Sequence, residues 1–456
     1  MAKLPLAGIR IVDLGRVFAV PYAGGLLADL GAEVIKIEGP GLVDTTREFP
    51  SGYYADNEPG EDPWNRISNF NMINRGKKSL VLDLARPEGL AVLKDLIKVS
   101  DVVIENFTPR VMRRWGLDYP GMKKIKPDII MASNAGYGGG DGPYSQYPAQ
   151  ATTQEATHGL AHVTGYRNGL PDKAGQSYVD FLASWTCMMG VALGLRHRRR
   201  TGKGLWVDAG MYQLGCYVVS EYVLDWEANA RMGGRIGNRH PWQAPQGCYR
   251  CAGEDQWCVV SVRDDEDWAA LCALMGKAEL AADARYVGNT GNAARMARHD
   301  EIDAIIGAWT KALTKFEVME RAQGAGVPAG AVFDSRDVNL DPHYRARGFL
   351  ETMQFAPERK MGKRVVMGRP WRMSKTPISI KGPGPMFGQH NREVLQGILG
   401  YTEAQAVELE QAGVIATHPA KPVRPSRMPM DQRVKLGRLA YYDPEFKQRL
   451  DIQDPE

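Results

Sequence analysis

Short apolar segments near the start of the chain alternate with small and polar residues. Residues 6–13 are mostly aliphatic and end on Asp13, and residues 33–38 have the same buried character. Residues 22–30 lie between them and are rich in alanine, glycine and leucine. They follow Pro21, which suits the first turn of a helix because its missing N–H is not needed there. The pattern predicts a strand, a helix and a strand, the βαβ unit of a buried parallel sheet.

Further apolar runs extend this prediction along the chain. Residues 101–109 predict a strand with a polar tip at its carboxyl end. Beyond residue 225 the pattern predicts a strand at residues 256–262, followed by helices at 266–275 and 301–312. Two short strands are predicted further on, at residues 365–366 and 378–380. We therefore expect an α/β protein.

The turn after the first strand lacks the motif of a dinucleotide-binding loop. Residues 15–21 contain a single glycine and no Gly-x-Gly-x-x-Gly, the pattern that brings the backbone against a pyrophosphate. No Gly-x4-Gly-Lys-Ser/Thr loop follows either early strand. We therefore expect neither a nucleotide redox cofactor nor nucleotide hydrolysis.

Several longer motifs resemble the family III CoA-transferases, the group that includes the carnitine and formyl-CoA transferases. They lie at residues 74–84, 86–89, 101–109 and 111–117, and later at 200–204, 237–241, 279–285, 325–330 and 388–391. The resemblance covers roughly residues 5–415, in the family's order. It implies a Rossmann-like large α/β domain built from N- and C-terminal segments, a smaller α+β domain and an interlocked dimer.

The same resemblance suggests a division of the chain. We expect residues 1–205 to form the first part of the CoA-binding domain and residues 225–330 the small domain. Residues 331–416 would return to the large domain, and residues 417–456 would form an extended tail outside the resemblance. The tail is rich in proline and arginine, which disfavours a helix. Its aromatic residues suit an anchor on a partner subunit, and a disordered terminus is the alternative.

Coenzyme A carries a pyrophosphate and a 3′-phosphate, so its pocket needs guanidinium, ammonium and backbone donors. Ligands of open α/β sheets bind outside the carboxyl ends of the strands, which favours the residues that follow 101–105. The resemblance implies CoA contacts at Phe18, Ala19, Asn74, Arg75, Asn106, Phe107, Arg114 and Tyr137. Lys77 and Thr108 are further candidates because they lie beside the same predicted strands. A solvated basic face is the alternative for the pair Lys77 and Lys78.

Some positions depart from the family pattern. Gly39 stands where an arginine that holds adenine commonly precedes Pro40, so one cation–π partner is missing. Phe18 replaces a common glutamine, and residues 242–247 replace a glycine-rich loop.

The departure with the largest chemical consequence concerns the nucleophile. The resemblance implies an aspartate three residues after a Thr-Gly pair, and Thr164-Gly165 leads to Asn168 instead. The family's covalent mechanism requires a carboxylate, and an amide nitrogen attacks poorly because its lone pair is delocalised. Glu155 and Asp172 are nearby carboxylates that could substitute, although neither matches a family nucleophile position.

Racemases share this fold family, so racemase activity is an alternative function. Their His-Asp pair corresponds here to Gln150-Ala151, although Asp180 matches their second aspartate. Because the general base is missing, we expect no racemase activity and interpret Asp180 as structural.

Three functional hypotheses remain. In the first, the chain is a subunit of a CoA-transferase that moves CoA from an acyl-CoA such as succinyl-CoA to an organic acid. It lacks its own nucleophile, and a homologous subunit supplies the aspartate, as in succinyl-CoA:benzylsuccinate CoA-transferase. In the second, the chain is self-sufficient and uses another carboxylate. In the third, it is a CoA-binding scaffold without catalysis.

Composition agrees with a cytoplasmic enzyme that binds neither nucleic acid nor membrane. The 456 residues are 44% hydrophobic with a formal net charge of +4. No run of about 18 apolar residues and no cleavable signal pattern appears. Cys248 and Cys251 have ligand-like spacing, but a second pair at zinc-ribbon distance is missing, so we expect no metal site.

Overall fold

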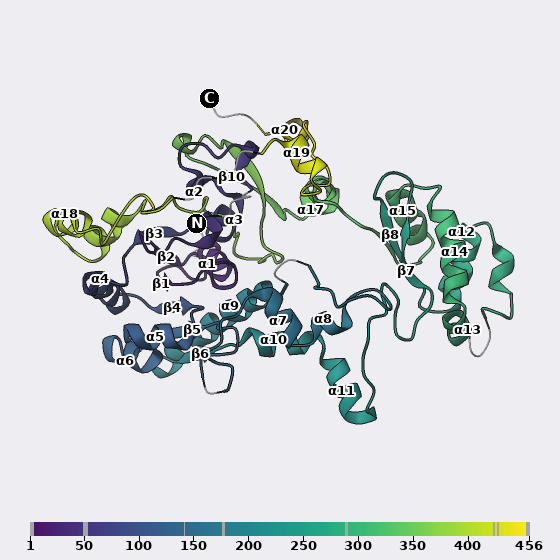
Figure 1. The fold of residues 1–456 in the computed structure, drawn as a ribbon, viewed down its shortest axis with the longest axis horizontal. Coiled ribbons are helices and arrows are strands. Elements are labelled where there is room, and N and C mark those ends of the chain that lie inside the picture. Colours follow the sequence, from purple (N-terminus) through teal and green to yellow (C-terminus); the bar gives the residue numbers. More distant parts are fainter. Residues whose placement is uncertain are drawn as a thin grey trace. The chain divides into compact units, whose positions relative to one another are not determined.

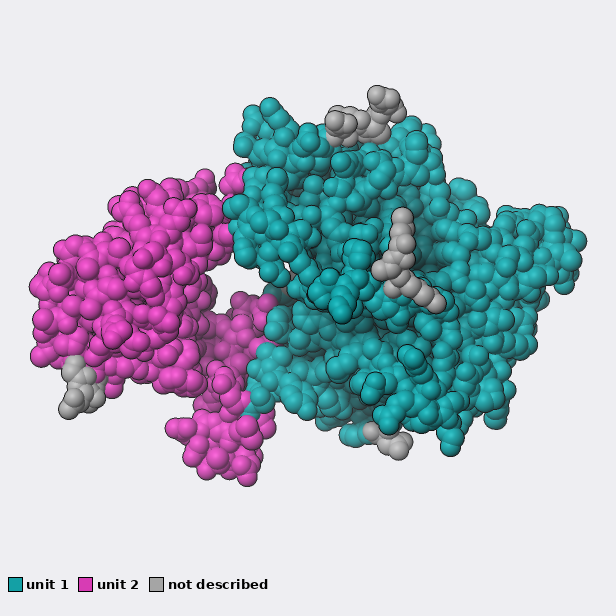
Figure 2. All heavy atoms as spheres, turned by 180° about the vertical axis from the view of Figure 1, so that it is seen from behind, with its two compact units in different colours: residues 1–158, 175–220, 339–456 teal, residues 159–174, 221–338 magenta. Residues whose placement is uncertain are grey.

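The computed structural model describes residues 4–48, 53–140, 142–175, 178–287, 291–422, 425 and 428–452. The chain divides into two compact units, which Figure 2 colours separately. The first unit comprises residues 1–158, 175–220 and 339–456, and the second comprises residues 159–174 and 221–338. The domain boundaries expected from the sequence stay a prediction.

A six-stranded parallel sheet forms the centre of the first unit (Figure 1). Its strand order is β3-β2-β1-β4-β5-β6, and Ile11 of β1 pairs with Val34 of β2 on one side and Val102 of β4 on the other. The strands are β1 (Arg10–Asp13), β2 (Glu33–Glu38), β3 (Lys78–Val81), β4 (Val102–Glu105), β5 (Ile130–Ser133) and β6 (Trp206–Asp208). The order reverses between β1 and β4, as in doubly wound sheets. The predicted α/β fold with a Rossmann-like sheet is confirmed.

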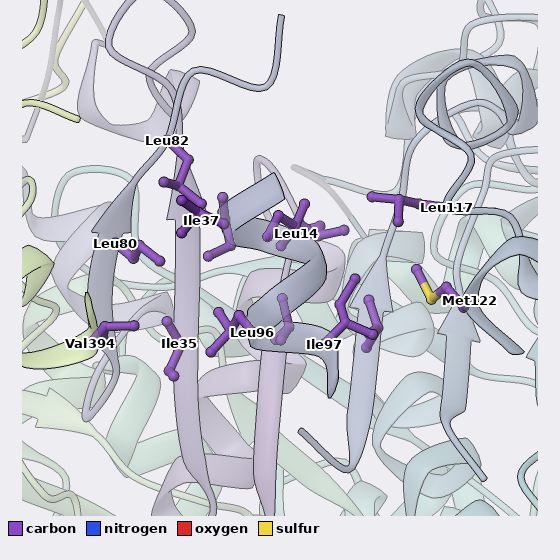
Figure 3. Packing of buried hydrophobic residues seen from close by; sticks show 14 of the residues in the cluster. Leu14, Ile35, Ile37, Leu80, Leu82, Leu96, Ile97, Leu117, Met122 and Val394 are labelled. Carbon is purple, nitrogen blue, oxygen red and sulfur yellow. The ribbon is translucent and has the colours of Figure 1, made fainter. Parts of the chain in front are cut away.

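Alternate residues of the strands face opposite layers of helices. One face packs against α4 (Pro87–Lys98), α5 (Pro109–Trp115) and α6 (Tyr119–Ile125). Figure 3 shows Leu96 and Ile97 among the side chains of this layer, together with Ile35 and Leu80 from the strands. The other face packs against α1 (Ala19–Asp29) and α9 (Tyr178–Thr201). The sheet is therefore buried on both sides, which explains why aliphatic residues lie on both faces of its strands.

The long helix α9 approaches the sheet closely because small residues face it. A Cβ added at Gly194 would lie 2.6 Å from Cγ2 of Ile130 on β5. Among the described residues, α9 is the one helix whose length and hydropathy would suit a membrane span. That is weak support for a span, because a core helix passes the same test.

Shorter helices complete the first unit. They are α2 (Pro63–Arg66), α3 (Ser68–Ile73), α7 (Ala151–Thr157), α10 (Met211–Val218), α17 (Pro342–Ala346), α18 (Glu403–Gln411), α19 (Met430–Lys435) and α20 (Phe446–Arg449). Residues 393–398 form a turn of π-helix.

The second unit packs helices against a small antiparallel sheet around the fully buried Trp268. Its strands are β7 (Gln246–Arg250), β8 (Trp257–Ser261) and β9 (Ala329–Ala331). Its helices are α8 (Leu160–Val163), α12 (Asp265–Leu274), α13 (Gly291–Ala297), α14 (His299–Thr310) and α15 (Lys315–Gly324). Helices α11 (Ser220–Asn229) and α16 (Ser335–Leu340) begin where the chain passes between units. The strand predicted at 256–262 and the two predicted helices are confirmed.

The returning chain forms a hairpin of β10 (Leu350–Gln354) and β11 (Lys363–Met367), which confirms the strand predicted at 365–366. The strand predicted at 378–380 is wrong. Side chains satisfy its backbone instead: Ile380 N donates to Glu351 at 2.9 Å, and Arg369 donates to the Ile378 carbonyl at 2.8 Å. An extended apolar segment therefore stays outside any sheet.

Candidate functional site

The loops after β1 and β4 meet at the switch point of the sheet. The Asn106 amide oxygen accepts from Arg16 N at 2.8 Å, and its amide nitrogen donates to Arg16 O at 2.9 Å. Val17 has a φ of +66°, a conformation that costs a β-branched residue energy and often occurs at functional loops. Phe18 and Ala19 then open α1. This edge, where the carboxyl ends of parallel strands meet, is where ligands of such sheets bind.

A buried network of ion pairs and hydrogen bonds holds the β1–α1 loop, residues 14–18. The Lys77 ammonium lies 2.6 Å from Asp13 and donates to the Asn74 amide oxygen at 2.8 Å. Burial lowers the pKa of Lys77 to about 8. Lys36 pairs with Asp44 at 2.8 Å and donates to the carbonyl of the loop residue Gly15. Both lysines and Asn74 are buried, so in this structure they hold the loop rather than face solvent. A CoA contact for Asn74 or Lys77 stays a prediction.

Arg75 is also enclosed, with 1% of its surface exposed. Its guanidinium lies 2.9 Å from Asp29, which Arg369 also approaches at 3.1 Å. Burial raises the pKa of Asp29 despite these two cations. Asp29 ends α1, a helix about 16 Å long, at the end away from the β1–α1 loop. The charge of Arg75 is therefore balanced inside the fold.

The segment after β4 presents cations to solvent. Phe107 packs edge-on against Trp115 at 5.1 Å, and Thr108 precedes α5 without a side-chain cap bond. Three arginines of α5 are exposed, and none of them has an ion pair among the described residues: Arg110, Arg113 and Arg114. Guanidinium groups without carboxylate partners are suited to phosphate.

Glu105 lies under this segment at the end of β4 and is 3% exposed. It accepts from Phe107 N at 2.8 Å. Burial raises its pKa to about 7, although hydrogen bonds from Ser133 and Phe107 oppose the shift. Sequence reasoning did not single out this residue, because a glutamate at a strand end looks solvent-exposed until the covering layers are known.

Tyr137 lies after β5 in a cluster of aromatic rings. Its ring centroid lies 5.5–6.3 Å from those of Tyr144, Tyr147 and Tyr212. Tyr144 and Tyr147 are about half exposed, at 48% and 55%. The carboxyl edge therefore also offers an aromatic surface.

Asp180 lies in the first turn of α9, next to the β1–α1 loop. Ser184, one helical turn later, donates to Ala19 O at 2.6 Å and to Asp180 O at 2.8 Å. Phe181 contacts the Phe18 ring at 6.3 Å. Residues four apart share a helix face, so Asp180 lies on the face that meets the start of α1. The sequence assigned Asp180 a structural role because the His-Asp pair of the racemases is missing. The loop at Phe18, which Asp180 neighbours in the fold, is some 160 residues away along the chain.

Asn168 belongs to the second unit and occupies a tight turn. Gly169 N donates to Tyr166 O at 2.9 Å, and Asn168 has a φ of +61°. Arg235 fixes the turn by donating to Gly169 O at 3.0 Å. Asparagine is among the few residues that adopt this left-handed conformation readily. The exposed turn thus accounts for an asparagine without reference to catalysis.

The two substitute carboxylates differ in exposure. Asp172 is exposed in the same loop, where its backbone N–H donates to Thr164 O at 3.1 Å. Glu155 is 1% exposed on α7 and lies near His158, whose ring a Cβ at Gly215 would overlap. Burial lowers the pKa of His158, and Glu155 opposes that shift. Glu155 would reach an acyl-CoA only after α7 moved.

Metal binding gains no support from the described part of the chain. No group of three His, Cys, Asp or Glu side chains there could hold an ion. Of the two cysteines with ligand-like spacing, Cys248 lies in β7 and Cys251 directly follows it, and burial raises the pKa of both thiols.

Comparison with known proteins places this geometry in a family. The model of CoA-transferase family III matches residues 6–391. The chain is 33% identical to succinyl-CoA–D-citramalate CoA-transferase of Chloroflexus aurantiacus, over 90% of this chain and 98% of that protein. It is equally identical, with the same coverage, to the beta subunit of succinyl-CoA–L-malate CoA-transferase of that organism. It is 30% identical to human succinyl-CoA:glutarate CoA-transferase, over 91% of this chain and 90% of that protein.

Solved structures agree. A CAIB/BAIF family protein from Brucella suis superposes with a TM-score of 0.77 and 28% identity, over 87% of this chain and 100% of that one. Rv3272 from Mycobacterium tuberculosis does so with a TM-score of 0.71 and 25% identity, over 85% and 98%. With the family model matched over most of its length and the parallel sheet in place, the chain belongs to CoA-transferase family III.

Proposed function

We propose that this chain transfers CoA from an acyl-CoA to an organic acid, and that Asp180 is the carboxylate that carries the acyl group. The observation behind this choice is the hydrogen bond from Ser184 to Ala19, which ties the first turn of α9 to the β1–α1 loop. Of the three candidate nucleophiles Glu155, Asp172 and Asp180, Asp180 is the one that the described contacts place beside the β1–α1 loop. This departs from the interpretation favoured by the sequence.

A single carboxylate can carry out the whole transfer through covalent intermediates. Asp180 attacks the thioester carbonyl of the donor, which forms a mixed anhydride and expels CoA thiolate. The thiolate attacks the aspartyl carbonyl of the anhydride, so the donor acid leaves and an aspartyl-CoA thioester remains. The carboxylate of the acceptor acid attacks that thioester, which forms a second mixed anhydride and expels CoA thiolate. The thiolate then attacks the acceptor's carbonyl, and the Asp180 carboxylate leaves. The products are the new acyl-CoA, the donor acid and the regenerated Asp180 carboxylate.

The competing proposal retains Asn168 as a vacant nucleophile position. The chain would then be an inert subunit, and a homologous chain would supply the aspartate. The supporting observation is that the relatives include alpha and beta subunits of succinyl-CoA–L-malate CoA-transferase. Glu155 and Asp172 are the substitute nucleophiles of a third version, in which the chain works alone without Asp180.

Activity of the isolated chain separates these proposals. We expect the purified protein to exchange labelled succinate into succinyl-CoA, and Asp180→Asn to lower the rate by at least about 10³-fold. Asn168→Ala should retain most of the activity, since it changes an exposed turn. Undetectable exchange by the lone chain, restored by a homologous subunit, would favour the inert-subunit proposal instead.

The same proposal covers substrates, assembly and location. Succinyl-CoA is the donor that we would test first, because the printed names of the most similar relatives contain it. CoA contacts at Phe18, Ala19, Asn106, Phe107, Thr108, Arg114 and Tyr137 are supported by their positions at the carboxyl edge. An interlocked dimer, or a hetero-oligomer, would cover an apolar stripe on α9 that is exposed in the single chain: Trp185, Met189 and Leu193. We propose that the enzyme acts in the cytoplasm.

A further inference from the structure

The chain beyond α18 runs along the carboxyl ends of β3 and β2. Val414 O accepts from Asp83 N at 2.8 Å just after β3. Ala416 O accepts from the Asn391 amide at 3.0 Å, and Ala420 N donates to Pro40 O at 2.8 Å just after β2. The yellow segment that leaves α18 in Figure 1 is this part of the chain. It lies beyond the residues that the family model matches.

We name residues 417–421 the edge segment. It is held in place by packing, and some of its polar side chains are exposed to solvent. Pro419 is buried, and the His418 ring contacts Trp64 edge-on at 6.0 Å. Trp64 is 8% exposed, and its indole N–H has no acceptor among the described residues. His418 and Lys421 are exposed, and within the described chain Lys421 has no ion pair. The edge segment therefore presents a ring and an ammonium next to the loop at Pro40.

The position of that loop suits part of a bound ligand. Ligands of open α/β sheets bind outside the carboxyl ends of the strands, and the loop at Pro40 directly follows β2. Here β2 ends in Glu38, which Arg47 binds with two nitrogens at 2.9 and 3.0 Å. The carboxylate is thus neutralised within the fold, and a phosphate on the ribose meets less repulsion than a free glutamate would cause.

A second cation faces the same loop. Arg16 donates to Val43 O at 2.7 Å. The half-buried Glu48 interacts electrostatically with Arg16, and burial raises the pKa of Glu48 although Arg16 opposes the shift. Arg16 and Lys421 thus place positive charge around the end of β2.

We propose that the edge segment forms one wall of the site for the adenosine 3′-phosphate end of CoA, with Lys421 pairing with the 3′-phosphate and His418 contacting the adenine. The segment lies where Gly39 omits the arginine side chain that the resemblance associates with adenine. This inference rests on the proposed function, because acyl-CoA is its ligand.

The test compares CoA with dephospho-CoA, which lacks only the 3′-phosphate. Binding of each compound to the full chain is measured by calorimetry, and KM is measured for the succinyl ester of each. Lys421→Ala should weaken CoA binding and raise KM for succinyl-CoA about tenfold, the loss expected for one charge-assisted contact. It should leave dephospho-CoA binding and kcat unchanged. Lys435→Ala, an exposed lysine of α19, is the matched control and should change nothing.

His418→Ala should weaken CoA and dephospho-CoA equally and leave succinyl-pantetheine, which lacks the adenosine, unaffected. Equal losses for CoA and dephospho-CoA in Lys421→Ala, or no loss in either, would overturn the 3′-phosphate assignment. A wild-type chain that binds CoA more tightly than dephospho-CoA but turns over no substrate would leave the inference standing and refute the proposed activity.

Discussion

Basic side chains of this protein fall into two groups. Buried ones form ion pairs inside the fold, and exposed ones are available to a ligand. Arg75 and Lys77 are enclosed with Asp29 and Asp13, whereas Arg114 is exposed without an ion pair among the described residues. All three are basic residues near strand ends in the sequence, so spacing could not distinguish them. Their partners are distant along the chain, and only the folded structure brings them together.

We predict opposite phenotypes for two matched arginine variants. Arg75→Met leaves Asp29 buried with one cation fewer and should lower the free energy of unfolding by about 3 kcal/mol, with KM for acyl-CoA unchanged. Arg114→Met should change stability by less than about 0.5 kcal/mol and raise KM about tenfold. Urea unfolding and steady-state kinetics measure both. If Arg75→Met raised KM while stability stayed constant, Arg75 would be a ligand contact.

The raised pKa of Glu105 predicts that the free energy of unfolding depends on pH. Its pKa rises from 4.5 to about 7 on burial, so the folded protein keeps a proton that the unfolded chain loses between these values. Stability therefore falls as pH rises through this window, and the cost above pH 7 is on the order of 3 kcal/mol. Glu105→Gln, which carries no charge, should be more stable than wild type at pH 8 and similar to it near pH 4.5.

Chemical unfolding at several pH values measures this difference. Glu88→Gln on the exposed side of α4 is the control, and its difference from wild type should not vary with pH in this way. A Glu105→Gln variant with a constant offset from pH 4.5 to 8 would contradict the assignment.

At the scale of elements, the sequence predicted the central strands β1, β2 and β4 of the sheet, but not β5 and β6. The βαβ pattern of residues 6–38 is present as β1, α1 and β2, because apolar strands and a small-residue helix leave few alternatives. Residues 6–9 form a turn instead of strand, since Leu6 and Ile9 use their N–H groups on Leu30 O and Leu6 O. The position of Asp180 beside Ala19 depends on the packing of α1 on α9, which no local pattern encodes.

That packing of α9 on the sheet depends on its glycines. Gly194→Ala should lower thermal stability by about 1–2 kcal/mol, because the new methyl lies 2.6 Å from Ile130 and the overlap outweighs the gain in helix propensity. Gly307→Ala on α14 has nothing within 4 Å and should be neutral or slightly stabilising. Calorimetry measures both, and a stabilised Gly194→Ala variant would show that the contact relaxes freely.

At the scale of the molecule, the exposed stripe on α9 predicts self-association. Single apolar residues on a surface are ordinary, but three that recur every four residues on one helix suggest a covered face. Met189 and Leu193 are each 56% exposed in the single chain. The double variant Met189→Glu and Leu193→Glu should shift sedimentation from dimer to monomer, with the far-UV spectrum retained. A wild-type protein that sediments as a monomer would refute the proposed assembly.

The central claim is that this chain carries its own nucleophile at Asp180, and trapping of the covalent intermediate tests it most directly. Hydroxylamine converts an aspartyl-CoA thioester to a hydroxamate, which peptide mass spectrometry locates. After incubation of the purified chain with succinyl-CoA, we predict the modification on the peptide that contains Asp180, and its loss in Asp180→Asn. A hydroxamate on Glu155 or Asp172, or no modification in a preparation that turns over only with a homologous subunit, would contradict the claim.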